Sequence, residues 1–184
     1  HHRFKRGYRN VINEAARLNE EGVECPLAME TSGHGALREN YFLDDGAYLM
    51  VRVLIEMARL RREGKDLIGL LRDLAEPCES EEFRIGIAGD DFKEYGKLAL
   101  DTLSAAAGVH SDWEPAPDNH EGVRFSKGDG WFMMRLSLHD PVLPVNMESD
   151  RTGGVREMAR ELYAVLNGMD RLDLGSLKRY IEKH

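Results

Sequence analysis

The sequence contains few cysteines and no long hydrophobic run, and both shortages exclude classes of protein. Its two cysteines are Cys25 and Cys78. They form no Cys-x-x-Cys pair, so we expect neither a disulfide framework nor a thiolate zinc site, but reduced thiols in a cytoplasmic protein. No apolar run approaches the ~20 residues that cross a bilayer, and no charged-then-apolar leader opens the chain. We therefore expect neither a membrane partner nor a secretory signal.

A surplus of basic residues is also missing. The 184 residues include 25 lysines and arginines against 33 aspartates and glutamates, which gives a formal net charge of -8. Because nucleic-acid binders usually carry a basic excess that neutralises phosphates, we expect no nucleic-acid partner. The composition that is present, 42% hydrophobic and 32% charged, is typical of a folded domain with a core.

Residues 1–75 are predicted to form helices around one short strand. Apolar residues recur at helical spacing over 11–21, and an apolar run at 25–29 is interpreted as a buried strand. A second helix is expected after Asp44-Asp45-Gly46, where acidic groups suit a helix N-terminus, and a shorter one over 66–74. A single buried strand without partners would leave amides unpaired, so this part resembles an incomplete α/β domain.

Residues 76–184 are predicted to form an α+β domain with a mainly antiparallel sheet and helices on one face. Alternating residues predict a strand over 83–87, and Lys127-Gly128-Asp129-Gly130 between apolar runs predicts a β-hairpin. A strand over 142–147 is expected at an edge or bulge because of Pro144. The other predicted segments are a linker over 75–82, a loop over 113–122, and helices over 92–107, 155–166 and 173–183.

The polar stretch Glu30-Thr31-Ser32-Gly33-His34-Gly35 is the first candidate binding site. A carboxylate can accept hydrogen bonds from two sugar hydroxyls, and glycines let the backbone approach a ligand. Such a loop after a strand suits the hydroxyl groups of a sugar. The residues alone are equally consistent with a capped turn that carries a surface histidine.

The second candidate is Arg135-Leu136-Ser137-Leu138-His139-Asp140-Pro141. The planar guanidinium of Arg135 matches phosphate oxygens, while Ser137 and His139 can add donors. A surface salt bridge at a strand end is the alternative, and it would be preferred if this stretch stood alone.

The basic leader and the histidines could serve other ligands, which are an anion for the leader and a metal ion for the histidines. The leader, with Arg3, Lys5, Arg6 and Arg9, could face a phosphate, contact nucleic acid or simply be solvated. The histidines at 34, 110, 120 and 139 show no ligand spacing, so we expect no metal site in this chain.

Together these segments resemble the α-D-phosphohexomutase family of phosphomannomutases and phosphoglucomutases. Glu30-Thr31-Ser32-Gly33-His34 is similar to the sugar-binding loop of the family's third domain, and Gly7-Tyr8-Arg9 to an earlier loop there that helps select the sugar. Residues 122–141 resemble the fourth domain, with its phosphate loop. The resemblance implies that residues 1–75 are the end of the third domain and residues 76–184 the fourth.

The resemblance also implies roles for particular residues. Substrate-binding residues would be Gly7, Arg9, Glu30, Ser32, Gly33, His34, Arg135, Ser137 and His139. The turn around Ser32 and the Arg135 loop would hold opposite ends of one ligand. The phosphorylated serine and the Mg²⁺ loop belong to the family's first and second domains, and neither motif occurs here. We therefore expect no catalytic residue and no metal ligand in this chain.

As a function, the resemblance implies interconversion of hexose 1-phosphate and hexose 6-phosphate, of mannose or glucose, through an enzyme phosphoserine and a bisphosphate. This chain would be inactive without the N-terminal domains of the same polypeptide. One departure concerns the phosphate loop, which in the family reads Arg-x-Ser-Gly-Thr-Glu-Pro, whereas Leu138, His139 and Asp140 stand here for glycine, threonine and glutamate. The alternative is a stand-alone sugar-phosphate-binding or interaction module without catalysis.

Overall fold

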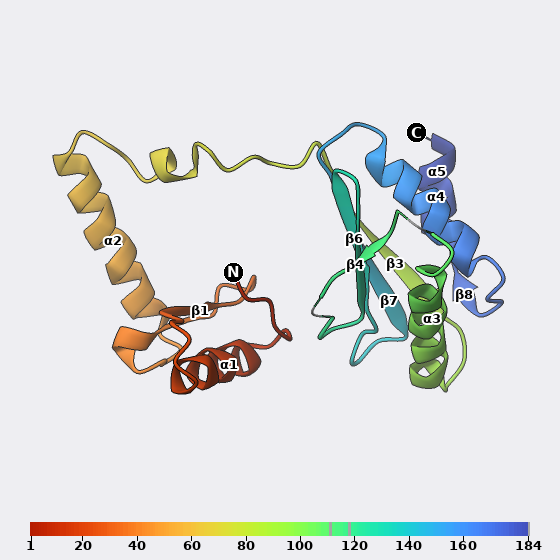
Figure 1. Ribbon diagram of the computed structural model, residues 1–184, viewed down its shortest axis with the longest axis horizontal. Helices are drawn as coiled ribbons and strands as arrows, with labels where there is room; N and C mark the ends of the chain where they lie inside the picture. Colours follow the sequence, from red (N-terminus) through yellow and green to blue (C-terminus); the bar gives the residue numbers. More distant parts are fainter. Residues whose placement is uncertain (111, 118, 184) are drawn as a thin grey trace. The chain divides into compact units, whose positions relative to one another are not determined.

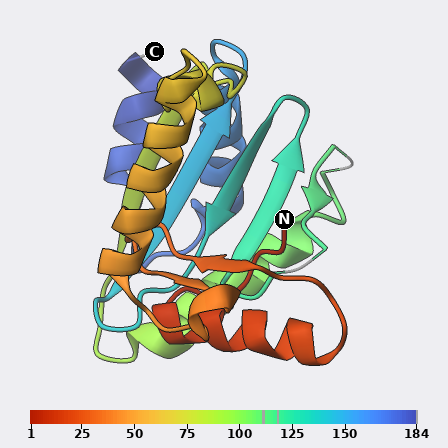
Figure 2. The same cartoon turned by 90° about the vertical axis from the view of Figure 1, so that its left-hand side faces the viewer.

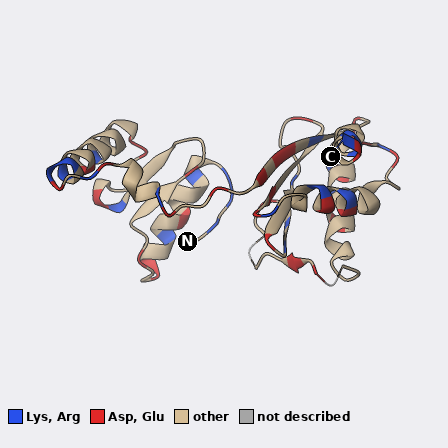
Figure 3. Cartoon of the chain, turned by 90° about the horizontal axis from the view of Figure 1, so that it is seen from above, with Lys and Arg blue, Asp and Glu red and all other residues tan. Residues whose placement is uncertain are grey.

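Two sheets of different size organise the chain. The computed structural model describes residues 1–110, 112–117 and 119–183, and they belong to two units, His1–Ala75 (unit 1) and Glu76–His184 (unit 2). Unit 1 contains a two-stranded sheet and unit 2 a six-stranded one (Figure 1). Both units carry charged residues of both signs (Figure 3).

The first helix of unit 1, α1 (Tyr8–Glu20), begins three residues before the predicted start. Gly7 precedes it with a φ of 102°, a conformation that favours glycine. The helix ends where predicted, because Gly22 adopts a φ of 83° and the Val23 amide donates back to the Leu18 carbonyl at 2.9 Å.

The sheet of unit 1 is a small hairpin. Strand β1 (Leu27–Met29) pairs antiparallel with β2 (Gly35–Leu37), a strand that the sequence does not predict. The prediction of one buried, unpaired strand is therefore wrong. Since side chains alternate along a strand, only Ala28 points inward at 5% exposure, while Leu27 and Met29 remain 43% and 58% exposed.

The long helix of unit 1, α2 (Gly46–Arg62), follows the short 3-10 turn η1 (Arg38–Asn40). Its predicted N-terminus is confirmed, since the Asp45 side chain accepts a hydrogen bond from the Tyr48 amide at 3.0 Å. Several apolar side chains along it are at least half exposed: Met50, Val51, Val53, Leu54 and Ile55.

The third helix predicted for unit 1, over residues 66–74, is longer than the element that forms. Only a 3-10 turn forms, η2 (Ile68–Leu71). Gly69 lies inside this turn, and its amide bonds to the Asp66 carboxylate at 2.7 Å. Glycine weakens a helix interior, which disfavours propagation beyond this turn.

The sheet of unit 2 has the strand order β4-β5-β6-β7-β3-β8, with every pair antiparallel. Helices α3, α4 and α5 lie on one face of it, which confirms the predicted architecture (Figures 1 and 2). The strands are β3 (Glu79–Ile87), β4 (Glu114–Pro115), β5 (Val123–Lys127), β6 (Gly130–Met134), β7 (Val142–Ser149) and β8 (Leu172–Asp173), and the helices are α3 (Phe92–Ala106), α4 (Gly154–Leu166) and α5 (Gly175–Lys183).

The core of unit 2 lies between the sheet and these helices. Helix α4 has the predicted amphipathic pattern and buries one side completely. Aromatic side chains form the centre of this core, where the Trp113 ring meets Phe132 edge-on with centroids 4.9 Å apart. The largest fully buried side chains include Ile85, Leu103, Phe125, Phe132, Met134, Leu143, Met147 and Leu162.

Strand β3 begins inside the segment predicted as a linker, residues 75–82. Glu79 is its first residue, and three of the four glutamates in the predicted linker lie along the start of the strand. Its apolar half is buried, with Phe83 at 5% and Ile85 at 0% exposure. The charge run therefore marked the solvated end of a strand, and the linker prediction is wrong for these residues.

Strand β7 is central in the sheet, which contradicts the edge position predicted from Pro144. The carbonyl of Pro144 accepts the Arg135 amide at 3.1 Å, just beyond the last β6–β7 pair, Met134 and Val145. In an antiparallel pair the amide and carbonyl of a residue face the same neighbour. Pro144 has no amide hydrogen to donate, but the residue opposite it on that side, Arg135, lies beyond the end of β6. No hydrogen bond of the β6–β7 ladder is therefore lost.

The predicted hairpin around Gly128 and Asp129 is confirmed. Strands β5 and β6 pair antiparallel from Val123 with Met134 to Lys127 with Gly130. Two strands of two residues each, β4 and β8, were missed; β4 lies in the predicted loop, and β8 delays the last helix to Gly175.

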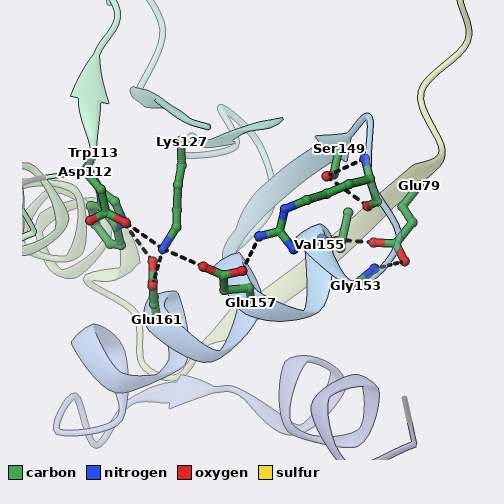
Figure 4. A network of polar contacts seen from close by, with 10 residues as sticks. Glu79, Asp112, Trp113, Lys127, Ser149, Gly153, Val155, Glu157 and Glu161 are labelled. Carbon is green, nitrogen blue, oxygen red and sulfur yellow. Dashed lines mark hydrogen bonds and ion pairs between the residues drawn. The ribbon is translucent and has the colours of Figure 1, made fainter. Parts of the chain in front are cut away.

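A network of charges ties β5 to α4 (Figure 4). The side chain of Lys127 is 8% exposed and makes ion pairs with Asp112 at 2.9 Å, with Glu157 at 3.2 Å and with Glu161. Burial opposes the charge of Lys127, but hydrogen bonds to these three carboxylates outweigh it and raise the pKa of the ammonium. The Trp113 indole also donates to Glu161, at 2.8 Å.

Replacing Lys127 with methionine should destabilise unit 2 by about 2 kcal/mol. The substitution removes the cation that pairs with Asp112, Glu157 and Glu161. The cost is limited because Asp112 and Glu157 are partly exposed to solvent. Urea unfolding followed by tryptophan fluorescence measures this, since both tryptophans, Trp113 and Trp131, belong to unit 2. Lys178→Met, on an exposed side chain of α5, should change stability by less than ~0.5 kcal/mol. Equal midpoints for both variants would contradict the role of the network.

Candidate functional site

The polar stretch after β1 is the turn of the hairpin in unit 1. The Glu30 amide donates to the His34 carbonyl at 2.9 Å, and the Gly33 amide donates to the Glu30 carbonyl at 2.9 Å. Gly33 has a φ of 92°, which other residues rarely adopt. The turn presents Thr31, Ser32 and His34 to solvent at its tip.

The carboxylate of Glu30 joins this turn to the leader. Its Oε1 accepts the Gly7 amide and its Oε2 accepts the Ser32 hydroxyl, each at 2.9 Å. The Gly7 hydrogen bond, followed by the Ser32 hydrogen bond, lowers the pKa of Glu30. Each carboxylate oxygen can accept more than one hydrogen bond, so the fixed group retains capacity for a ligand's hydroxyls.

His34 is held from two sides. Its Nδ1 lies 2.7 Å from Asp44 Oδ2, and its ring stacks on Tyr8 with centroids 4.9 Å apart. Because an ionised carboxylate only accepts hydrogen bonds, Nδ1 carries the hydrogen, and Nε2 is the nitrogen that can meet a ligand. Asp44 therefore orients His34, whereas its neighbour Asp45 caps α2.

Arg9 reaches the same surface through Tyr8. Its Nε donates to the Tyr8 hydroxyl at 3.1 Å, and its guanidinium lies 5.7 Å from the centre of that ring. The predicted site residues of unit 1, which are Gly7, Arg9, Glu30, Ser32, Gly33 and His34, thus form one connected cluster. Tyr8 and Asp44 complete it and were not predicted as site residues.

In unit 2 the second candidate stretch connects β6 to β7. Ser137 donates its amide to the Val142 carbonyl at 3.0 Å, and its Oγ accepts the Asp140 amide at 3.2 Å. The loop amides of both residues are therefore used internally. The side chains of this stretch that can donate to an anion include the hydroxyl of Ser137 and the guanidinium of Arg135.

Two features around this loop escaped the sequence analysis. Gly122 lies directly against it, since a Cβ at this position would come within 2.7 Å of the Arg135 Cα. Arg84 of β3 also reaches it, with Nη2 3.9 Å from Asp140 Oδ2. The signal for Arg84 was its outward place in an alternating strand. His139 and its neighbour Leu138 are exposed on the loop.

Neither unit offers a metal centre in its described part. Within residues 1–110, 112–117 and 119–183, no group of three or more His, Cys, Asp or Glu side chains is arranged to hold an ion. Among the same residues, no helix combines the length and hydrophobicity needed to span a membrane.

Comparison with known proteins identifies the family. Residues 1–78 match the model of the phosphoglucomutase/phosphomannomutase alpha/beta/alpha domain III. The phosphomannomutase/phosphoglucomutase of Pseudomonas putida is 30% identical over 128 residues, which cover 67% of this chain and 25% of that protein. A phosphoglucomutase of Neisseria meningitidis is 26% identical over 143 residues, which cover 76% of this chain and 29% of that protein.

A solved structure agrees with these matches. The crystal structure of a phosphoglucomutase/phosphomannomutase family protein from Burkholderia thailandensis superposes with a TM-score of 0.65 at 26% identity, covering 90% of this chain and 32% of that one. The chain belongs to the phosphoglucomutase/phosphomannomutase family and corresponds to a C-terminal part of it. It spans about a quarter to a third of the length of the relatives it matches.

The Ser32 hydroxyl should hold the pKa of Glu30 down. The folded-state pKa lies below the ordinary value of 4.5, so the ionised carboxylate stabilises the turn above pH 4.5. This stabilisation is lost as the pH falls through the folded-state pKa. Ser32→Ala should raise the pKa of Glu30 toward 4.5 in a carboxyl-detected NMR titration, and Thr31→Ala should not. An unchanged titration of Glu30 in Ser32→Ala would show that the hydrogen bond does not form.

Proposed function

We propose that this chain is the substrate-binding part of a phosphohexomutase that interconverts hexose 1-phosphate and hexose 6-phosphate of glucose or mannose. The observation that carries the proposal is the fixed carboxylate of Glu30, oriented by the Gly7 amide and the Ser32 hydroxyl beside His34. The relatives whose names state such an activity support it.

The residues of unit 1 are proposed to bind the hydroxyls of the sugar. A carboxylate whose position is already fixed loses little freedom when it accepts hydrogen bonds from neighbouring hydroxyls. Nε2 of His34 adds a group that can accept or donate. Ser32 remains an acceptor after donating to Glu30, so the turn offers acceptors that suit hydroxyl donors.

The residues of unit 2 are proposed to bind the phosphate that is not being transferred. The guanidinium of Arg135 provides paired donors that match phosphate oxygens, and Ser137 provides a hydroxyl. Phosphoryl transfer depends on positioning and charge stabilisation, so a group that holds the inert phosphate contributes without taking part in bond making. His139 is proposed to replace the family's threonine at this site.

The chemical step is proposed to need residues outside this chain. In this account the phosphoserine, the Mg²⁺ ligands and the bisphosphate intermediate depend on N-terminal domains of the same polypeptide, and the chain alone is inactive. The thiols Cys25 and Cys78 are both free, in keeping with a cytoplasmic protein.

Removal of the guanidinium from Arg135 should weaken hexose phosphate binding about tenfold or more, the effect expected from losing a charge-assisted hydrogen bond. Isothermal titration of the 184-residue chain with glucose 6-phosphate and mannose 6-phosphate measures this for Arg135→Gln. Arg160→Gln, which removes an exposed arginine from α4, is the matched control. Equal dissociation constants for the two variants would contradict the proposed phosphate site.

Replacing Glu30 with glutamine should weaken binding of glucose 6-phosphate about tenfold and leave binding of inorganic phosphate unchanged, because Glu30 is proposed to contact hydroxyls only. Glu20→Gln, on an exposed side chain of α1, keeps the same change in net charge and should affect neither ligand. If Glu30→Gln altered both ligands equally, or neither, the sugar-binding role of the turn would be wrong.

A further inference from the structure

The register of unit 2 places two arginines in one row of the sheet. Arg84 of β3 pairs with Pro144 of β7. On the other side of β7, the Arg135 amide bonds to the Pro144 carbonyl at 3.1 Å, directly after the pair of Met134 and Val145. The row therefore reads Arg84 of β3, Pro144 of β7 and Arg135, the residue that follows β6.

Both arginines lie on the face of the sheet that the helices do not cover. Phe83 and Ile85, which flank Arg84, are buried at 5% and 0% exposure, and Met134, which precedes Arg135, is at 0%. Because side chains alternate along a strand, Arg84 and Arg135 point to the opposite face. Figure 2 shows this side of the sheet in front of the blue helices.

The separation suits one small anion. Two strand spacings of ~4.8 Å put the two arginine backbones roughly 10 Å apart, a gap that two arginine side chains can close on one phosphate. The residue between them, Pro144, is buried and carries neither a charge nor a polar side chain. It therefore does not compete with the guanidiniums for the anion.

The present partners of Arg84 are weak. Its Nη1 lies 3.7 Å from Glu82 Oε1 and its Nη2 lies 3.9 Å from Asp140 Oδ2. Both distances exceed that of a hydrogen bond, and the Arg84 side chain is 58% exposed. Exposed ion pairs of this kind contribute little free energy, so a ligand can displace them.

Two amides of the loop are already used, since those of Ser137 and Asp140 donate inside it. Arg84 reaches this loop through Asp140. A second guanidinium would add paired donors beside those of Arg135.

We propose that Arg84 is a second phosphate-contacting residue, which together with Arg135 clamps the phosphate of a hexose phosphate beside the loop that contains Asp140. The inference rests on the proposed function, because it assigns a further residue to the same phosphate site. Asp140 pairs with Arg84 in the absence of ligand and releases it when phosphate binds.

Titration of the 184-residue chain with inorganic phosphate and with glucose 6-phosphate tests the clamp. Arg84→Gln should weaken both ligands about tenfold, the loss of roughly one charge-assisted hydrogen bond. Arg160→Gln removes the same charge elsewhere and should leave both dissociation constants unchanged. Asp140→Asn should bind at least as tightly as the unmodified chain, because it removes the group that competes for Arg84.

Other outcomes of this titration would contradict either the role of Arg84 or the phosphate site itself. If Arg135→Gln weakens binding and Arg84→Gln matches Arg160→Gln, Arg84 is no ligand and the proposed function stands. If Asp140→Asn weakens binding as much as Arg84→Gln, Arg84 only positions the loop, and the clamp is wrong. If Arg135→Gln has no effect either, the phosphate site itself is wrong and the clamp falls with it.

Discussion

The pairing of β3 with β7 is the constraint on which unit 2 depends. The two strands match residue for residue from Glu79 with Ser149 to Gly86 with Val142. At one end this pairing brings the Glu79 carboxylate to the amides of Gly153 and Val155, at 2.7 and 3.0 Å, so that it caps α4 (Figure 4). Toward the other end it sets Arg84 beside Pro144. One register thus orients a core helix and shapes the proposed phosphate site.

Unit 1 relies on a different kind of constraint, a polar one. Few of its side chains are buried, and the turn after β1 is held by hydrogen bonds that meet at Glu30. The same bonds that stabilise the turn also fix the carboxylate that is proposed to accept sugar hydroxyls. In the proposed function, the two units therefore divide recognition by chemistry: acceptors for hydroxyl groups in one, and cationic donors for phosphate in the other.

The sequence predicted the elements whose signals are local. Helix α4 and the hairpin at Gly128 followed from periodicity and turn residues, and the candidate loop that begins at Glu30 follows a strand as expected. Errors arose where pairing partners decide the outcome, as with β2 and with Pro144 in a central strand. The contacts from Gly7 to Glu30 and from Arg84 to Asp140 join residues distant in sequence, which no local pattern reveals.

The most direct test is a map of amide chemical shifts on the 184-residue chain during titration with three ligands. Inorganic phosphate should perturb the loop around Arg135 and Ser137 and leave the turn at Glu30 unchanged. Glucose 6-phosphate should perturb both regions, and free glucose at most the turn. Perturbation by glucose 6-phosphate at neither region, at concentrations where the chain is shown to bind it, would contradict the assignment of these loops as the recognition surfaces.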